Sequence, residues 1–275
     1  MSGRRNSTRN KIAVASWRPS RDGRIYTRME LDVSAVLAYV DRVRSESGER
    51  VTITHVVGAA LGRALRQVPE VRARIVMGRR LDLDTCDVGF AVDIAGGSDL
   101  APVKVLGVDR LSPLEVARAV TSGAGQLRAG KDVAYRRSSG IVRLVPTWAV
   151  RPALGVASLV AGGLGRGVLG QPGFPLGTAF VSNVGSLGLD EAYLAPLPFA
   201  RTPLYLAIGA IQDKAVVIDG EVVVRPVVVL VATADHRIVD GAHAGQLAGI
   251  VRELLLHPDR LDPAGRPDAM GRADS

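Results

Sequence analysis

The chain has 275 residues, 47% of them hydrophobic, and a formal net charge of +8. A chain of this length and composition can bury a substantial core, which excludes an intrinsically disordered protein. Aromatic residues make up only 4%, and the basic residues are scattered outside the N-terminus, so we expect no binding to nucleic acid. Residues 1–11 are polar and rich in arginine, and we interpret them as a flexible basic tail.

The single cysteine, Cys86, excludes a disulfide framework and a cysteine-based metal site. One thiol suits a reducing compartment, so we expect a cytoplasmic protein. His236 and His243 do not have the i, i+4 spacing of a zinc-binding helix, and we predict no metal site. The N-terminus lacks the apolar stretch of a signal peptide, and no run of about 18 apolar residues predicts a transmembrane helix.

Helices and strands are mixed in the first half of the chain. Hydrophobic spacing predicts, in order, a strand over 26–33, a helix from 33 to a stop at Gly48, a helix over about 54–68 ended by Pro69, and strands over 81–94 and 100–106 joined by a Gly96-Gly97 turn. Ser112 and Glu115 form a capping box around Pro113, which predicts a helix from there to about residue 127. His55, near the start of the second helix, is interpreted as a structural residue.

The second half is richer in strands. The predicted elements are strands over 177–182, 203–211, 215–218 and 221–234, followed by a helix over 240–256. Asp219-Gly220 is typical of a hairpin turn. Residues 258–275 are polar and are expected to form a C-terminal tail without regular structure. Because the elements do not alternate as βαβ units, the pattern favours an α+β sandwich in which helices cover one sheet.

The most informative stretch is Asp-His-Arg-Ile-Val-Asp-Gly, which runs from Asp235 to Gly241 between the last predicted strand and helix. A histidine and an aspartate four residues apart can share one pocket there, and histidine can act as a base near neutral pH. A histidine at a strand end is by itself more often structural, but the surrounding residues favour catalysis by His236. His243 and His257 are interpreted as solvated helix residues.

This stretch resembles the active-site signature of the acyltransferase (E2) core of 2-oxoacid dehydrogenase complexes. Chloramphenicol acetyltransferase shares the shorter form, His-x-x-x-Asp-Gly. Further stretches resemble the same family in the same order: Val68–Val71, Asp87–Val92, Leu100–Val103, Phe180–Gly185 and Leu206–Gly209. The resemblance covers about residues 24–130 and 177–260. It implies a chloramphenicol acetyltransferase-like sandwich, a mixed sheet covered by helices, in one catalytic domain over residues 12–257.

The resemblance also implies a homotrimer with active sites at subunit interfaces, where the histidine comes from one subunit and the serine from its neighbour. His236 would be the general base that deprotonates the thiol of CoA, because the thiolate is the nucleophile. Ser182 matches the serine that donates a hydrogen bond to the tetrahedral oxyanion, although a serine beside Asn183 is equally suited to capping a loop. Asp240 would orient the pocket or stabilise charge.

Four neighbours are expected to support these residues: Asp235, Arg237, Gly241 and Asn183. Asn183 and Gly241 would shape the backbone, and Gly241 would allow a close approach of the chain. CoA is then a substrate, and the residues that bind it are not assigned by the sequence. A lipoyl group enters only if another protein supplies it, because no lipoyl domain is recognised in the chain.

The chain departs from the family in an apolar insertion at about residues 131–175. Packing of this insertion against the core or another subunit is favoured. Contact with a membrane interface and a lid over the active site are the alternatives. The polar residues after Leu261 replace the apolar end that links trimers into cages in the family, so a higher assembly of trimers is left open.

The expected function is CoA-dependent acyl transfer of the E2-core type, between CoA and a dihydrolipoamide-like thiol held on another protein. Two alternatives stay open. The first is a catalytically inactive E2-like core that serves as a scaffold or cage subunit. The second is a peripheral membrane protein that uses the insertion.

Overall fold

A computed structural model describes residues 23–93, 100–129, 156, 158–167, 173–197 and 200–262. The expected basic tail, the Gly96-Gly97 turn and most of the insertion lie outside these residues. Within the described ranges, no helix is long and apolar enough to cross a membrane.

The strands form one mixed sheet of seven and a separate hairpin. The large sheet has the order β1-β9-β7-β6-β4-β5, with β8 paired to β9, and β4, β6 and β7 run parallel to one another. Its strands are β1 (Arg24–Asp32), β4 (Val88–Asp93), β5 (Leu100–Val105), β6 (Ala179–Asn183), β7 (Leu204–Ile208), β8 (Gln212–Ile218) and β9 (Glu221–Asp235). The hairpin joins β2 (Ala73–Val76) to β3 (Arg79–Asp82).

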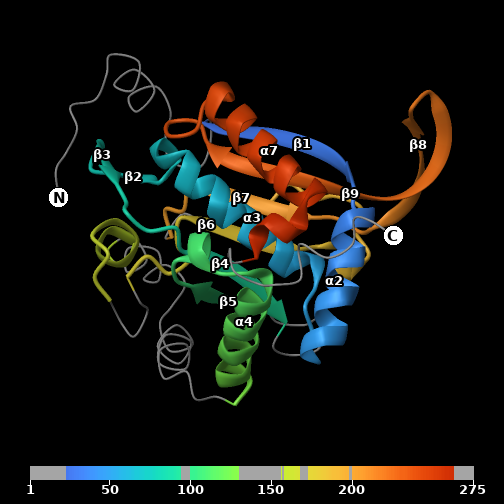
Figure 1. Cartoon of the computed structure of the whole chain (residues 1–275). Helices are drawn as coiled ribbons and strands as arrows, with labels where there is room; N and C mark the ends of the chain where they lie inside the picture. The colour runs from blue at the N-terminus through green and yellow to red at the C-terminus, as the bar shows by residue number, and fades with distance from the viewer. Residues whose placement is uncertain are drawn as a thin grey trace.

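In the described part of the chain, four helices pack on one face of the sheet (Figure 1). They are α2 (Ser34–Ser47), α3 (Ile53–Gln67), α4 (Pro113–Arg128) and α7 (Gly241–Leu256). Helix α3 lies between α7 and α4 and is buried along most of its length. It can lie directly on the sheet because Gly58 has no Cβ, which would be 2.5 Å from the ring of Phe90. The expected α+β architecture is confirmed.

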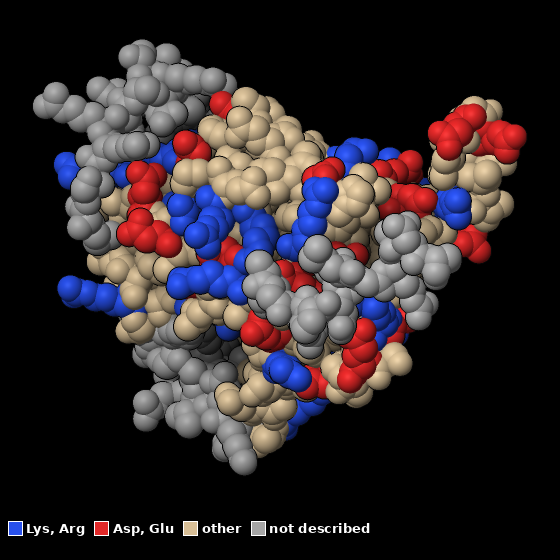
Figure 2. Space-filling view, viewed as in Figure 1, with Lys and Arg blue, Asp and Glu red and all other residues tan. Residues whose placement is uncertain are grey.

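Two capping predictions are confirmed in the helix layer. Ser112 accepts a hydrogen bond from the backbone of Glu115 at 3.3 Å, and the carboxylate of Glu115 accepts one from the backbone of Ser112 at 2.7 Å. Gly48 ends α2 in the left-handed conformation, with φ of 68°. Figure 2 shows that Lys and Arg side chains gather over the part of this face where α3 lies, with acidic side chains around them.

The strand predicted over 81–94 is wrong as a single element. The structure ends β3 at Asp82 and begins β4 at Val88, and the two strands belong to different sheets. The break is stabilised at Asp87, whose side chain accepts a hydrogen bond from the backbone of Gly107 at 3.0 Å. The carbonyl of Asp87 accepts another from the backbone of Thr178 at 2.7 Å. These long-range partners cannot be read from the local alternation of apolar residues.

Residues directly after α7 are also more ordered than the sequence predicts. A 3-10 turn, η5 (Pro258–Leu261), buries Leu261 completely between α2, α3 and α7. Tyr39 donates a hydrogen bond from its hydroxyl to Asp262 at 2.7 Å, and Arg42 forms an ion pair with Asp259. The start of the expected tail is therefore part of the helix layer, because its leucine completes the core.

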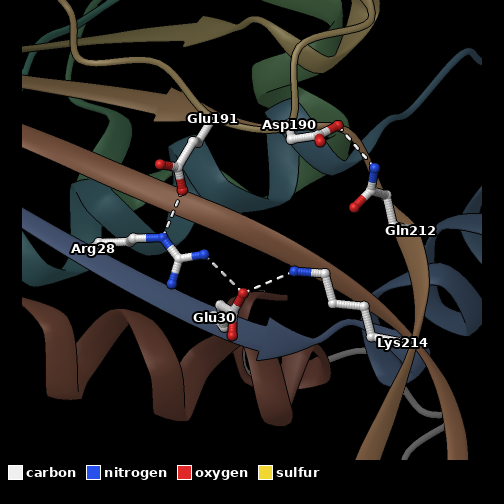
Figure 3. Close-up of polar contacts among 6 residues, drawn as sticks. All are labelled: Arg28, Glu30, Asp190, Glu191, Gln212 and Lys214. Atoms are coloured by element: carbon white, nitrogen blue, oxygen red, sulfur yellow. Dashed lines mark hydrogen bonds and ion pairs between the residues drawn. The ribbon is translucent and has the colours of Figure 1, made fainter.

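The second face of the sheet is covered by the segment at residues 189–197, which follows β6. Leu194 packs against Val229 and Tyr205, both buried beneath this segment. Figure 3 shows how polar contacts hold it in place. Glu191 accepts a hydrogen bond from Arg28 of β1 at 2.5 Å, and Asp190 accepts one from Gln212 of β8 at 2.8 Å.

The hairpin of β8 and β9 extends beyond the sheet as a curved two-stranded arm (Figure 1). The predicted turn is confirmed, because Asp219 and Gly220 both have positive φ, 52° and 87°. Three valines on the arm, Val217, Val222 and Val224, are at least 70% exposed. These valines form an apolar surface that no residue of the described chain covers. An isolated two-stranded ribbon is only marginally stable in water, so a partner that covers this surface would stabilise the arm.

The described part of the insertion packs against the hairpin of β2 and β3. Its residues 158–163 form a π-helical turn, η3, in which Ala161, Gly162 and Gly163 are buried. Arg74 of β2 donates hydrogen bonds to the carbonyls of Gly162, Gly177 and Ala200 at 3.1, 2.6 and 2.6 Å. For residues 158–163, the structure agrees with the expected packing of the insertion against the rest of the same chain.

Candidate active site

The sequence motif forms a tight turn at the junction of β9 and α7. The backbone N–H groups of Ile238 and Val239 both donate to the carbonyl of Asp235 at 2.9 Å. The guanidinium of Arg237 binds the carboxylate of Asp235 through Nη2 at 2.5 Å and Nε at 2.8 Å. Asp235 and Arg237 therefore fix the turn that presents His236.

His236 is held at both its backbone and its ring. Its N–H donates to the carbonyl of Gly23 at 2.6 Å, and its Nδ1 lies 2.9 Å from the carbonyl oxygen of Val239. A carbonyl oxygen can only accept, so this contact places the ring proton on Nδ1. Nε2 is then the basic nitrogen, and the turn provides the tautomer that a general base requires.

Asp240 lies at the N-terminus of α7 and caps it. Its Oδ1 accepts a hydrogen bond from the backbone of His243 at 3.0 Å and lies 2.9 Å from Nδ1 of that residue. His243 also accepts a hydrogen bond from the backbone of Asp240, at 3.3 Å, which completes a capping box. The sequence interpretation of His243 as a simply solvated residue missed this role. The signal was present in its position three residues after an aspartate.

The close approach expected at Gly241 is not present in the described chain. A Cβ built on this residue meets no atom within 4 Å. Close backbone contacts occur instead near the end of β6, where a Cβ on Gly185 would be 2.4 Å from the carbonyl oxygen of Gly209. The glycine that shapes the backbone next to a site residue is therefore Gly185.

Ser182 lies on β6 and is 9% exposed. Its hydroxyl makes no hydrogen bond to any residue in the described ranges, so the loop-capping interpretation does not hold for it. Asn183 and Ser186 make the turn contacts: Asn183 accepts from the backbone of Ser186 at 3.1 Å and donates to Thr54 at 2.9 Å. Asn183 thus holds the turn after β6, and the hydroxyl of Ser182 has no hydrogen-bond partner among the described residues.

The sheet register separates Ser182 from His236 within one subunit. Ser182 pairs with Ala207, and Ala207 pairs with Val231 on β9. His236 follows Val231 by five residues, which is roughly 16 Å along the strands, and two strand spacings add about 10 Å across the sheet. The two residues lie toward opposite ends of the strands, so one subunit does not bring them together.

Two titratable groups outside the turn, His55 and Cys86, are buried in the core. His55 accepts a hydrogen bond at Nδ1 from the backbone of Thr52 at 3.0 Å, and burial lowers its pKa to about 4. Burial also raises the pKa of the Cys86 thiol. Among the residues that the structure describes, no group of three His, Cys, Asp or Glu is arranged to hold a metal ion.

A mixed sheet with helices on one face and a histidine turn before the last helix defines the chloramphenicol acetyltransferase-like class of folds. A structure of chloramphenicol acetyltransferase itself superposes with a TM-score of 0.50 and 16% identity, covering 91% of this chain and 96% of the other. Residues 9–134 and 167–262 match the family model described as 2-oxoacid dehydrogenases acyltransferase (catalytic domain). The chain belongs to that family.

Curated relatives include a probable dihydrolipoyllysine-residue succinyltransferase component of the 2-oxoglutarate dehydrogenase complex from Schizosaccharomyces pombe. It is 26% identical over 88% of this chain and 46% of its own length. A dihydrolipoyllysine-residue acetyltransferase component of the pyruvate dehydrogenase complex from Mycoplasma capricolum is 27% identical over 77% of this chain and 40% of its own length. The chain spans less than half the length of either of these relatives.

Two solved acetyltransferase structures show the same fold. A probable dihydrolipoamide acetyltransferase from Listeria monocytogenes superposes with a TM-score of 0.64 and 18% identity, covering 94% of this chain and 91% of the other. The dihydrolipoamide acetyltransferase from Azotobacter vinelandii superposes with a TM-score of 0.62 and 16% identity, covering 86% of this chain and 83% of the other. For that enzyme, the catalytic roles of a serine, a histidine and an asparagine four positions after the histidine were investigated.

Proposed function

We propose that the protein is a CoA-dependent acyltransferase of the E2-core type. It moves an acyl group between CoA and a dihydrolipoamide-like thiol held on another protein. The observation that carries the proposal is the turn from Asp235 to Gly241, which holds His236 with Nε2 as its basic nitrogen. The turn occurs in a chain of the matching family and at the same junction of strand and helix that the family signature predicts.

In the proposed reaction, Nε2 of His236 takes the proton from the attacking thiol. The resulting thiolate adds to the thioester carbonyl, and the tetrahedral oxyanion receives a hydrogen bond from the hydroxyl of Ser182. Collapse of this intermediate breaks the original carbon–sulfur bond, and the leaving thiolate takes the proton back from His236. Asp240 holds the first turn of α7, and its distance of four residues from the histidine equals that of the asparagine in the A. vinelandii enzyme.

The same proposal includes a homotrimer in which each active site is shared by two subunits. The distance between Ser182 and His236 within one chain supports it, because an oxyanion donor must lie within hydrogen-bond range of the reacting carbonyl. The exposed valines on the arm of β8 and β9 also support it, since a neighbouring subunit would bury them. Assembly of trimers into a larger particle is a further part of the proposal.

A lipoyl-bearing protein is the proposed partner, because both curated relatives are dihydrolipoyllysine-residue acyltransferase components of dehydrogenase complexes. A reducing compartment such as the cytoplasm is proposed as well, since the single thiol of Cys86 is buried and unpaired. The two relatives differ in acyl group, one being a succinyltransferase and the other an acetyltransferase component. The acyl group is therefore to be found by comparing acetyl-, succinyl- and branched-chain acyl-CoA.

The test is an acyl-transfer assay with purified protein, those CoA thioesters and dihydrolipoamide. We expect transfer with at least one thioester, and we expect His236→Ala to lower kcat by about 100-fold or more. Ser182→Ala should lower kcat by about 10²–10³ with little change in KM, as expected for a donor that acts on the transition state. The proposal is wrong if no thioester reacts, or if His236→Ala retains full activity.

The scaffold alternative is separated from the enzyme by calorimetry with CoA. A catalytically inactive core need not bind CoA, whereas the enzyme must. The alternative of membrane binding through the insertion is separated by flotation with liposomes, with and without residues 140–170. Membrane binding is excluded if the protein stays away from the liposomes both with and without residues 140–170.

A further inference from the structure

A cavity lies between the sheet and α7, outside the turn that holds His236. Its volume is about 150 Å³. Leucines from β7 and β9 form its floor, and its other walls come from β1, α3 and α7. Four alanines line it: Ala232 and Ala234 on β9, and Ala244 and Ala248 on α7. Small side chains on both sides leave the space unfilled, because neither surface reaches the other.

The chemistry of the cavity is apolar inside and basic at the rim. Leu204, Leu206, Leu230 and Leu247 contribute only hydrocarbon to the walls. Two arginines, Arg28 and Arg252, are the charged residues in the lining, and both are exposed to solvent. Such a site suits a ligand with a short hydrocarbon chain and one anionic end.

The two arginines differ in their partners. Arg28 donates hydrogen bonds to Glu30 of β1 and to Glu191 of the segment at residues 189–197, at 2.8 and 2.5 Å (Figure 3). Its guanidinium is therefore paired on the second face of the sheet, away from α7. Arg252 forms no ion pair or hydrogen bond with any residue that the structure describes. The next residue, Glu253, is paired with Arg260 at 2.6 Å. Arg252 is thus the cation at the rim that can bind an added carboxylate.

We propose that this cavity binds a short free carboxylic acid as its anion, with the chain among the alanines and leucines and the carboxylate at Arg252. An aliphatic cavity of about 150 Å³ holds a guest the size of benzene, which corresponds to a chain of about six carbons. Val239, whose carbonyl oxygen contacts the ring of His236, also lines the cavity. An occupant therefore touches the residue that orients the histidine and is placed to change its activity.

This inference does not depend on the proposed acyl transfer, because binding is measured without CoA. Hexanoate is titrated into the protein and followed by calorimetry and by methyl NMR signals of the lining residues. We expect saturable binding and shifts confined to the cavity. Ala248→Leu should abolish binding by filling the space, while Arg252→Gln should weaken it about tenfold by removing the charge-assisted contact.

Arg118→Gln, an exposed arginine on α4, is the matched control and should bind hexanoate as the wild type does. Ala244→Met fills the same space and replaces Ala248→Leu if that variant unfolds. Equal binding by the filled variants would overturn the proposal, as would equal affinity for hexanol and hexanoate. If hexanoyl-CoA binds through the cavity and hexanoate does not, the cavity holds the acyl group of a substrate and the proposal is also wrong.

Discussion

At the scale of single residues, Asp240 has a structural task that the active-site motif does not reveal. It caps α7 through His243, and the cap also fixes where the helix begins relative to His236. A carboxylate so engaged contributes to stability whether or not it takes part in chemistry. The two contributions can be separated by substitution, because asparagine caps a helix as well as aspartate does.

We expect Asp240→Ala to lower the free energy of unfolding by about 1 kcal/mol, within a range of about 0.5–2. Asp240→Asn should retain the cap and change stability by less than about 0.5 kcal/mol. Urea denaturation at equal protein concentration measures both. Equal losses in the two variants would contradict the capping role. If Asp240→Asn keeps its stability and still loses most of its kcat, the negative charge of Asp240 has a catalytic role.

His55 is the other residue whose position in a helix cap has a measurable consequence. Its Nδ1 accepts a hydrogen bond from Thr52, so the cap requires the unprotonated ring. The folded pKa of about 4 lies below the ordinary value of 6.5. Between these values the unfolded chain binds more protons, so the stability that the neutral ring provides is complete above pH 6.5 and decreases as the pH falls toward 4.

We therefore expect the protein to lose about 2–3 kcal/mol between pH 7 and pH 4.5 relative to His55→Gln. Glutamine keeps an acceptor at the same position of the capping box and does not titrate. Denaturant unfolding of both proteins at the two pH values gives the difference. Identical pH profiles would show that burial does not lower the pKa of His55 in the folded protein.

How far the sequence predicts the site depends on the range of the interactions that form it. The proposed roles of His236 and Ser182 are predicted from short motifs, and the capping box at Ser112 is predicted from spacing alone. The burial of Arg74 could not be predicted, because its three acceptors come from residues about 90 to 130 positions away. In the sequence it does not differ from the exposed arginines around it.

At the scale of elements, Arg74 connects the hairpin of β2 and β3 to the insertion. Its guanidinium is buried against the ring of Phe174 at 4.1 Å and has no carboxylate partner among the described residues. Burial lowers its pKa to about 10, so it stays charged at neutral pH. Three carbonyl oxygens compensate the charge, and they would lose their donor if the side chain were removed.

Arg74→Met should therefore cost about 2–5 kcal/mol, because the buried carbonyls of Gly162 and Ala200 lose this donor. The carbonyl of Gly177 keeps a hydrogen bond from the hydroxyl of Thr202. Arg79→Met, an exposed arginine on the adjacent strand, should stay within about 0.5 kcal/mol of the wild type. Thermal and urea unfolding test both variants. Similar stability of the two would mean that the insertion is not held by this contact.

The paired strands β8 and β9 and their turn follow from a local hairpin signal, whereas the boundary between β3 and β4 depends on contacts with distant loops. The cavity beside α7 could not be predicted either, since the four alanines that create it belong to two elements far apart in the sequence.

At the scale of the whole molecule, a shared active site can be tested by mixing two inactive variants. His236→Ala and Ser182→Ala subunits are co-expressed with different affinity tags, and mixed trimers are isolated. If each site takes its histidine and serine from two subunits, some sites combine two intact residues. Each isolated mixed trimer then has one intact site out of three, so about one third of wild-type activity should be restored.

Trimers that contain His236→Ala subunits alone, carried through the same isolation, are the control and should remain inactive. Mixed trimers that form and show no activity would contradict the shared site.

The exposed arm of β8 and β9 has a consequence for how catalysis depends on the amount of protein. An enzyme whose active site lies within one subunit keeps the same turnover per subunit at any dilution. If association covers the arm and completes the site, dissociation removes both together. Turnover per subunit should then fall below the concentration at which trimers form, and the cellular level of the protein would itself set the fraction of subunits able to react.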